Sequence, residues 1–543
     1  MKEECPMELN LNGLVDRASW EAAGYQLPQF DIQAVTEKTK KAPNWLHIGG
    51  GNIFRAFPAA VLQRLLDEGH ADKGLVVAEC FDGDIIERAY QPYDNLSLLC
   101  TLGSDGSVKK KVIASVVESL RCDGEKPEDD ARLQEIMASP SLQMVSFTIT
   151  EKGYAYMDSN GVPLSFILKD ISRLPHSAQT TIGKITAGLL ARFENGGAPV
   201  ALLSMDNCSH NGDKLRAAVL YIAEGWRENQ YVSKDFIQYL LDETKVAFPI
   251  SMIDKITPRP DDNVAAMLKE DGFVYAAPFV TRRNTYTAAY VNAEETEYLV
   301  AEDKFPAGRP ALEKAGIYFV ERDVVDKCEK MKVCTCLNPL HTCLAVLGCI
   351  LGHTFISKEM QDEDLNKLVH RIAYQEAMPV VVDPGILSPA EFAKEVLEKR
   401  FPNPFMPDTP QRIATDTSQK LSIRFGETLK AYDESPVLDP KTLKCIPFVL
   451  AAWLRYLMAL DDNLEEFTPS SDPLLETMQN AISFIKIKST VTVEQLAPIL
   501  DNEDIFGVKL TKLGLAPLVT EYLNQMLEGK GAVRAALKKL LAE

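Results

Sequence analysis

A cluster of three glycines directly after a short apolar run constrains the fold of this chain more than any other feature. The run Trp45–Ile48 precedes Gly49-Gly50-Gly51, and a helical pattern follows in which Pro58 must lie in the first turn or kink the helix. Glycines at such a turn let the backbone approach a pyrophosphate, which helix N-terminal amides bind. We therefore expect Gly49 and Gly51 to contact a dinucleotide. The third glycine of the usual fingerprint is missing, so a glycine-rich turn without a ligand is the alternative.

The pattern of the chain changes near residue 300. Before that point, short apolar or β-branched runs alternate with helical stretches, which is typical of βαβ units in a mostly parallel sheet. The expected strands are Trp45–Ile48, Leu75–Glu79, Met144–Ile149, Val200–Met205 and Phe273–Val280. Later segments have helical periodicity: Ala390–Lys399, Lys444–Leu460, Leu474–Ile487 and Leu518–Leu527. We predict an α/β Rossmann-type dinucleotide-binding domain over residues 1–300 and a mostly α-helical substrate and catalytic domain over residues 301–543.

Two acids near the end of the second expected strand are candidates for binding the cofactor ribose. Glu79 ends the run Leu75–Glu79, somewhat later after Gly49 than a dinucleotide fold usually places its ribose-binding carboxylate. A carboxylate there repels a 2′-phosphate, so Glu79 would favour NAD over NADP. Asp82 competes for the same role, and either acid could equally be a solvated strand end.

The net charge and the lengths of the apolar runs disfavour several classes of partner. The formal net charge of -19 repels nucleic acid and anionic membranes. Residues 1–10 carry no apolar run of a secretory signal. The longest apolar stretches, Cys343–Gly352 and Phe448–Leu460, are shorter than the ~18 residues that span a bilayer. We therefore expect a cytoplasmic protein without nucleic-acid or membrane partners.

Cysteine and histidine side chains raise the question of a metal site. Cys334, Cys336, His341 and Cys343 are metal-ligand types within ten residues. A closed structural site usually draws its ligands from two separated pairs, whereas small buried thiols explain this cluster adequately. We expect no metal, and reduced thiols throughout. Among the other histidines, His47 is expected to be a hydrogen-bonded core residue, and His210 to cap a turn.

The densest group of chemically capable side chains lies between Glu329 and His341. Hydride transfer to or from a secondary alcohol needs a base for the hydroxyl proton and donors that stabilise the developing alkoxide. A lysine whose pKa burial lowers, an amide and an imidazole suit these roles, which points to Lys332, Asn338 and His341. A solvated surface lysine is the alternative reading of Lys332.

Five blocks of sequence, in order between Trp45 and Arg424, resemble the long-chain mannitol dehydrogenase family. This family includes mannitol dehydrogenases, fructuronate reductases and tagaturonate reductases. The blocks are the glycine segment with Arg55-Ala56, Thr148–Tyr154, Asp206–Gly212, Phe248–Pro258 and Lys332–His341.

The resemblance implies a zinc-independent enzyme whose active site lies between a Rossmann-type domain and a helical domain. By similarity, Lys332 is the general base, Asn207 and Asn338 hydrogen-bond the reacting oxygen, His341 orients the hydroxyl and Glu329 passes the proton to solvent. Asp254 contacts the sugar chain, and Arg412 and Lys420 bind substrate. The expected cofactor contacts are Gly49, Gly51, Asn52, Ile53, Phe54, Glu79, Asp82, Thr150, Glu151 and Lys152.

One departure from the family pattern affects the expected base. The family usually has five residues from the lysine to the asparagine and then a small residue. Here the step from Lys332 to Asn338 is six, and Pro339 follows. We therefore expect an extra residue or bulge in the helix before Asn338, with Lys330 as the fallback base.

The substrate is expected to be a sugar acid or a polyol. Arg412 and Lys420 suit a carboxylate or hydroxyls, and local cations on so acidic a protein favour an anion. The Asn338–His341 segment also resembles the uronate-reducing branch. We expect an NAD-dependent enzyme, NADP being less favoured, that reduces D-fructuronate to D-mannonate as a monomer or small homo-oligomer. The alternatives are mannitol 2-dehydrogenase, which interconverts mannitol and fructose, tagaturonate reductase, and a non-catalytic dinucleotide-binding protein.

Overall fold

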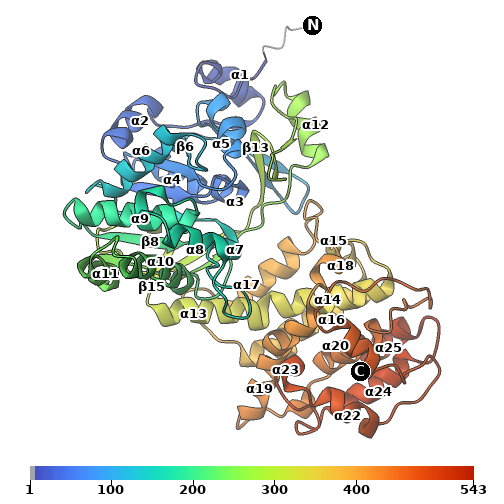
Figure 1. The fold of residues 1–543 in the computed structure, drawn as a ribbon. Coiled ribbons are helices and arrows are strands. Elements are labelled where there is room, and N and C mark those ends of the chain that lie inside the picture. The colour runs from blue at the N-terminus through green and yellow to red at the C-terminus, as the bar shows by residue number, and fades with distance from the viewer. Residues whose placement is uncertain (1–5, 543) are drawn as a thin grey trace. The chain divides into compact units, whose positions relative to one another are not determined.

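The computed structural model describes residues 6–542, which form two compact units (Figure 1). Among the described residues, unit 1 comprises 6–103 and 107–325, and unit 2 comprises 326–542 with 104–106. The division falls later than the change of pattern near residue 300, because β15 (Tyr318–Val320) still pairs with β14 (Tyr298–Glu302) inside unit 1. The predicted fold class, an α/β unit followed by a mostly helical one, is confirmed.

Unit 1 is built around a six-stranded parallel sheet with the order β6-β3-β2-β7-β8-β9. The chain first builds outward from β2 to β3 and β6, and then continues from β7 on the other side of β2. In such a doubly wound sheet, ligands bind outside the carboxyl ends of the strands, where the strand order reverses. The strands are β2 (Trp45–Ile48), β3 (Leu75–Glu79), β6 (Val116–Arg121), β7 (Met144–Phe147), β8 (Val200–Ser204) and β9 (Val246–Ala247).

Both faces of this sheet are covered, which explains why its strands are apolar runs without alternation. Leu46 and Ile48 of β2 belong to one buried cluster, with side chains from α6, α9, α10 and α11. Trp45 belongs to the cluster on the other face, with side chains from α4 and α5. The helices are α4 (Pro58–Asp67), α5 (Asp84–Ala89), α6 (Pro127–Ala138), α9 (Thr181–Glu194), α10 (Asn211–Glu228) and α11 (Lys234–Leu241).

Smaller sheets complete unit 1, and one predicted strand is wrong. The run 273–280 does not form a strand of the main sheet; Phe273 makes an isolated bridge with Met7, and β11 (Phe279–Val280) pairs in a hairpin with β12 (Tyr286–Thr287). Phe273 is buried against the ring of Trp20 rather than in a sheet. The other sheets comprise β1 (Tyr25–Gln26), β5 (Val108–Ile113), β4 (Ser97–Leu102) and β13 (Tyr290–Glu294), and β10 (Ser251–Asp254) with β14 and β15.

Unit 2 is helical, and its centre is a helix interrupted once. α13 (Arg322–Met331) begins in unit 1 and continues through a π-helical segment, Lys332–Cys336, into α14 (Asn338–Leu351). α14 packs on α20 (Cys445–Tyr456), and α20 packs on α24 (Ala516–Met526). Further helices are α16 (Glu363–Arg371), α17 (Pro389–Glu395), α18 (Pro410–Ile413), α19 (Glu427–Glu434), α21 (Leu475–Ala481), α22 (Val493–Leu500) and α25 (Ala532–Ala542).

The interrupted helix is longer than its apolar run suggested. Over Arg322–Leu351 it is long and apolar enough to cross a bilayer, contrary to the expectation from the run Cys343–Gly352 alone. However, 78% of its most apolar window is buried inside the structure. A core helix of a folded domain has this burial, so the apolar character is accounted for by packing.

Candidate active site

The glycine turn after β2 combines one sterically required glycine with one open position. Gly49 has φ +106°, and a Cβ atom there would lie 2.3 Å from the Thr148 carbonyl oxygen. Gly51 precedes α3 (Asn52–Ala56), and a Cβ built on it would meet no atom within 4 Å. The turn therefore needs glycine at Gly49 for its own geometry, whereas Gly51 leaves room for a ligand to approach the backbone.

The residues after the glycines differ in what they can offer a cofactor. Asn52 and Ile53 are partly exposed, and the Asn52 side chain accepts a hydrogen bond from Arg55. The Phe54 side chain is fully buried and stacks on the His47 ring with centroids 4.1 Å apart, so only its backbone is left for a ligand. Helix α3 ends at Ala56, and Pro58 begins α4, which is a position in the first helical turn that a proline tolerates.

The structure separates the two acids that the sequence left as alternatives. The Glu79 carboxylate is 7% exposed and accepts hydrogen bonds from the backbone N–H groups of Gly50 (2.8 Å), Phe81 (2.9 Å) and Asp82 (3.1 Å). Asp82 lines a cavity of about 270 Å³ and accepts bonds through Oδ2 from Thr281 and Thr285. Glu79 therefore braces the glycine turn, whereas Asp82, itself buried at 4% exposure, lines the cavity.

The segment after β7 is held by an acid that the sequence did not single out. Asp206, at the end of β8, accepts hydrogen bonds from the N–H groups of Ile149 and Thr150, both at 2.9 Å, and from the Tyr154 hydroxyl at 2.5 Å. Thr150 has φ +64°, while Glu151 and Lys152 are exposed. Burial raises the pKa of Asp206 and, together with that carboxylate, raises the pKa of Tyr154. Asp206 thus shapes the turn at the edge where the strand order reverses.

Two expected substrate contacts lie at strand ends in unit 1. Asn207 is exposed directly after Asp206, and Asp254 is the buried last residue of β10. His210 occupies the N-cap position of α10 in a left-handed conformation, but its side chain makes no capping hydrogen bond and instead lies 3.1 Å from the Asp213 carboxylate. Because Asn207 and Asp254 belong to unit 1, their convergence with Lys332 of unit 2 stays a prediction.

The expected base occupies the irregular part of the central helix in unit 2. Lys332 begins the π-helical segment and is 3% exposed. The Leu337 N–H donates to the Lys332 carbonyl at 3.1 Å, five residues back instead of the four of an α-helix. Asn338 then begins α14. The bulge predicted before Asn338 is therefore present, and it absorbs the additional residue between the lysine and the asparagine.

The fallback base is in a different environment. The Lys330 side chain is 52% exposed and pairs with Glu427 at 3.2 Å. Because Lys330 is exposed and ion-paired whereas Lys332 is buried, nothing here favours Lys330 as the base. Glu329, the expected proton relay, is partly exposed one turn before Lys332 on the same helix.

His341 lies on α14 in a cationic environment. Its ring packs on Phe401 with centroids 4.8 Å apart, and Nε2 lies 3.7 Å from Asp408 without a hydrogen-bond partner among residues 6–542. Burial, helped by the charges of Arg424, Arg412 and Arg400, lowers the His341 pKa to about 3. The imidazole is consequently neutral near pH 7, and its Nε2 is left for a ligand hydroxyl.

The two expected substrate cations flank this histidine unequally. Arg412 is exposed and pairs with Asp408, so its charge already has a partner. Lys420 donates to the Thr415 carbonyl at 2.5 Å, and burial together with Arg424 lowers its pKa. Arg424 itself donates to the Thr342 hydroxyl, one residue after His341. The structure thus brings His341, Arg412 and Lys420 together in unit 2 and adds Arg424 to them.

The cysteines near this site are core residues. Cys334, Cys336 and Cys343 are all buried, and burial raises the pKa of each thiol, to about 11 for the first two. No group of three His, Cys, Asp or Glu side chains able to hold a metal is found in the described part of the chain. His47 is fully buried and bonds Ser146 and Thr148, which confirms the expectation of a hydrogen-bonded core imidazole.

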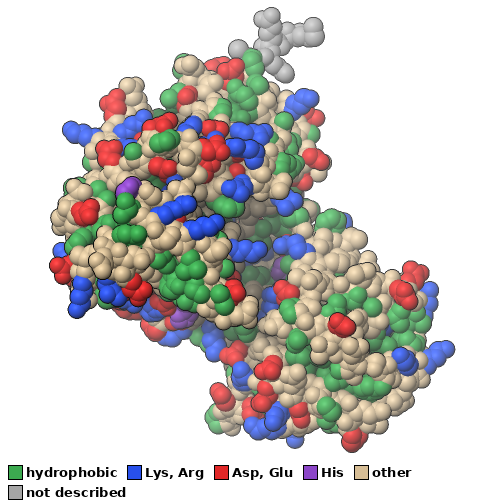
Figure 2. Space-filling view, in the orientation of Figure 1, with side chains coloured by type: hydrophobic (Ala, Val, Ile, Leu, Met, Phe, Trp, Pro, Cys, Tyr) green, Lys and Arg blue, Asp and Glu red, His purple; other side chains and the backbone are tan. Residues whose placement is uncertain are grey.

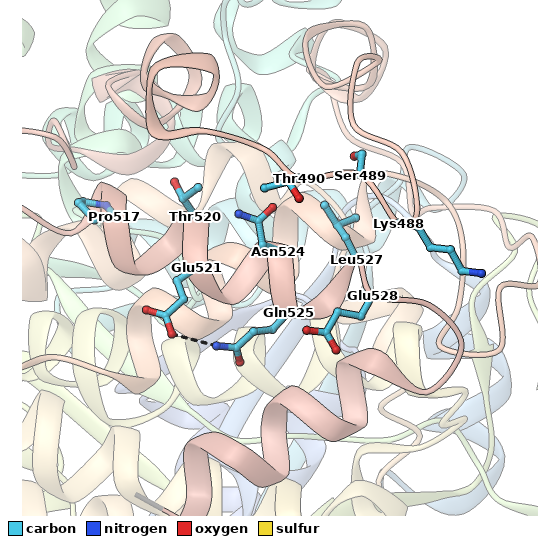
Figure 3. Close-up of a pocket in the computed structure, with 10 residues that line it drawn as sticks. All are labelled: Lys488, Ser489, Thr490, Pro517, Thr520, Glu521, Asn524, Gln525, Leu527 and Glu528. Carbon is cyan, nitrogen blue, oxygen red and sulfur yellow. Dashed lines mark hydrogen bonds between the residues drawn. The ribbon is translucent and has the colours of Figure 1, made fainter.

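A second cavity lies away from all of these residues. It measures about 640 Å³ and lies between α24 and the loop at Lys488–Thr490 (Figure 3). Its lining is polar, and Glu521 and Gln525 bond each other along the helix. None of the predicted site residues lines it. On the face seen in Figure 2, basic side chains lie among acidic ones instead of forming one continuous basic surface.

Family comparisons agree with this arrangement. Residues 43–314 match the mannitol dehydrogenase Rossmann domain, and residues 324–527 match the mannitol dehydrogenase C-terminal domain. The chain belongs to the mannitol dehydrogenase family. The family, the fold class and the dehydrogenase class expected from the sequence are thereby confirmed.

Several relatives show how far the likeness extends. The chain is 49% identical to D-mannonate oxidoreductase of Thermotoga maritima over 98% of this chain and 99% of that protein. It is 29% identical to mannitol 2-dehydrogenase of Cereibacter sphaeroides, covering 83% of this chain and 87% of that one. The structure of Pseudomonas fluorescens mannitol 2-dehydrogenase, a ternary complex with NAD and D-mannitol, is similar with a TM-score of 0.68 and 26% identity over 99% and 100% of the two chains.

Three features of the site could not be recognised from the sequence. Asp206 accepts a hydrogen bond from Ile149, which is distant in the sequence. Asp408 pairs with Arg412, which the sequence had suggested as a substrate contact. Arg424 carried one signal, its position four residues after Lys420, which places both side chains on one side of a helical turn. Only the structure shows that Arg424 contacts α14.

Proposed function

We propose that this protein is an NAD-dependent D-mannonate oxidoreductase, which interconverts D-mannonate and D-fructuronate. The observation that carries the proposal is the 49% identity to D-mannonate oxidoreductase along nearly the whole of both chains. The cation group around His341 supports an anionic substrate, because Arg424 and Lys420 have no carboxylate within ion-pair distance in residues 6–542. Mannitol 2-dehydrogenases are similar at a lower identity.

The cofactor proposal has support in unit 1. The open backbone at Gly51 suits a pyrophosphate, and Asp82 beside its cavity suits the ribose hydroxyls. A carboxylate at that place disfavours the 2′-phosphate of NADP. Asn52, Ile53 and the backbone at Phe54 extend this side of the site, and Thr150, Glu151 and Lys152 follow the neighbouring strand. When bound, NAD supplies the acceptor or donor of the hydride.

The protein's own groups handle the proton and the oxygen of the reacting alcohol. In the oxidation direction Lys332, which is buried, takes the hydroxyl proton. The amides of Asn207 and Asn338 hydrogen-bond the oxygen as negative charge develops on it. Neutral His341 orients the hydroxyl through Nε2, and Glu329 carries the lysine's proton to solvent. Asp254, Arg412 and Lys420 bind the rest of the substrate.

The test is a substrate screen on the purified full-length protein. D-mannonate, D-altronate, D-mannitol and D-arabinitol are each supplied with NAD and with NADP, and reduced nicotinamide is followed by absorbance. We expect kcat/KM to be highest for mannonate with NAD. Preference for altronate or mannitol would replace the proposed substrate, and the absence of turnover with all four would favour a non-catalytic dinucleotide-binding protein. Monomer or small-oligomer assembly is measured in the same preparation by light scattering.

A further inference from the structure

Arg424, which is partly buried, differs from the buried arginines Arg192, Arg121 and Arg55 in how its charge is satisfied. Arg192 donates five hydrogen bonds to backbone carbonyls, and Arg121 pairs with three carboxylates. Arg55 donates to a backbone carbonyl and two side chains. Within residues 6–542, Arg424 makes a single hydrogen bond, to Thr342, and no ion pair. A guanidinium group carries five N–H donors, so most of its donors are unused by the protein.

This arginine lies among residues already assigned to the substrate. Its bond to the Thr342 hydroxyl places it beside His341 on α14, and Thr342 in turn donates to the Asn338 carbonyl at 3.0 Å. Its charge also acts on Lys420 and on His341, whose pKa values it lowers. Arg424 is therefore inside the substrate-binding part of unit 2 and not on a separate surface.

The charges nearby do not neutralise Arg424. Asp408 is paired with Arg412 and forms no ion pair with Arg424 among residues 6–542. Asp416 and Asp472 influence Lys420, but neither lies within ion-pair distance of Lys420 or Arg424 among the described residues. Burial alone accounts for the lowering of the Arg424 pKa to about 10. A cation withdrawn from water without an anion is costly, so the site is completed when an anion enters.

We infer that Arg424 binds the carboxylate of the sugar-acid substrate and so makes this enzyme specific for acids over neutral polyols. This inference rests on the proposed function and adds the residue that distinguishes the two substrate classes. Arg412 is less suited because Asp408 already occupies it, and Lys420 offers a point charge rather than a planar fork. A guanidinium group can hold a carboxylate with two parallel hydrogen bonds. The single bond to Thr342 leaves enough N–H donors of Arg424 for such a pair.

The test compares an acidic ligand with its neutral counterpart. In R424Q, we expect kcat/KM for D-mannonate to fall by about 100-fold or more, mainly through KM, because a buried charge pair is lost. Binding of D-mannitol to the NAD-loaded protein, measured by calorimetry, should change by less than about threefold, because a neutral polyol has no carboxylate to lose. R424K keeps the charge without the fork and should fall between wild type and R424Q.

Controls separate recognition from folding and from general charge. K399Q removes an exposed cation from the neighbouring segment of unit 2 and should leave mannonate turnover unchanged. Melting temperatures show whether each variant is folded. If R424Q is not folded, R424K is used in its place, and a loss of mannonate kcat/KM without a matching loss of mannitol binding supports the inference.

Three outcomes are distinguishable. If R424Q lowers kcat/KM for mannonate and the affinity for mannitol by the same factor, Arg424 only positions Thr342 and Asn338. That result would overturn the inference. Unchanged mannonate kinetics would overturn it as well while leaving the proposed function intact. Wild-type protein that does not oxidise mannonate at all would instead refute the proposed function.

Discussion

Replacing His47 should remove a defined part of the acid sensitivity of unit 1. This imidazole is fully buried, with Nδ1 bonded to Ser146 at 2.6 Å and Nε2 to Thr148 at 2.9 Å. No carboxylate contributes to its surroundings, and burial lowers its pKa from 6.5 to about 3. The folded protein therefore keeps this side chain neutral at pH values where the unfolded chain protonates it.

The magnitude follows from these two pKa values. Above pH 6.5 the imidazole is neutral in both the folded and the unfolded chain, so it does not change the free energy of unfolding there. As the pH falls from 6.5 towards 3, only the unfolded chain binds the proton, so stability is lost over that window. Between pH 7 and pH 5 the loss from this single group is about 2 kcal/mol.

The assay compares how much the unfolding free energy changes between pH 7 and pH 5 in each protein. Unfolding free energies of unit 1 are obtained by hydrogen exchange of peptides covering β2 and β7, at pH 7 and at pH 5, for wild type, H47Q and the control H70Q. His70 is exposed, so its replacement removes an imidazole without removing a buried one. H47Q should be less stable at pH 7 but lose about 2 kcal/mol less on going to pH 5. An acid-induced loss identical in H47Q and wild type would refute the reasoning, because it would mean that the buried imidazole is not what the unfolded chain protonates.

The remaining predictions concern the site. Lys332→Ala should lower turnover by at least ~100-fold with nearly unchanged NAD affinity, measured by steady-state kinetics and fluorescence titration; an unimpaired variant would move the base elsewhere. Asp82→Asn should raise the ratio of kcat/KM for NADP to that for NAD by about tenfold, whereas Glu79→Gln should weaken both cofactors equally; a changed ratio in the Glu79 variant alone would reverse their roles. Deleting Val333 should convert the π-helical segment to α-helix and leave a folded enzyme with at least about a tenth of its kcat/KM, whereas deleting Val346 from α14 rotates the helix by about 100° and should abolish folding. Equal damage from both deletions, judged by melting temperature, would contradict the bulge argument.

The strands that carry the cofactor half were predictable because the physics that selects them is local. Trp45–Ile48 and Leu75–Glu79 are buried on both faces, which requires continuous apolar runs, and both begin and end as predicted. The outer strand was not predictable. Val246–Ala247 is only two residues long, too short for a pattern, while Phe273 carries a strand-like signal but is buried against Trp20. Aromatic residues are common in strands because strands are buried, but a buried aromatic residue can equally lie outside a sheet.

The roles of the acids after β3 show a second limit. Glu79 and Asp82 are both acids and close in sequence, but Glu79 accepts a hydrogen bond from the Gly50 N–H, whereas Asp82 accepts hydrogen bonds from Thr281 and Thr285. The contact between Glu79 and Gly50 joins two strand ends across the sheet, so no local pattern contains it. By contrast, the extra residue before Asn338 could be predicted because it is a matter of spacing along one helix, and the π-helical segment confirms it.

Helical irregularity itself marks the substrate half. Four π-helical segments occur in the described part of unit 2, at Lys332–Cys336, Ile372–Ala377, Val396–Arg400 and Ser422–Gly426. One begins with the expected base, and two contain arginines whose charges act on His341. Each such segment adds a residue to a helical turn at the cost of poorer hydrogen-bond geometry, and it shifts the side chains that follow relative to those before. A pattern of 3.6 residues per turn therefore loses its register at the segments that contain Arg400 and Arg424. Sequence periodicity locates helices of this unit because they are packed, but it misses Arg424, which lies in a segment where the helical repeat is interrupted.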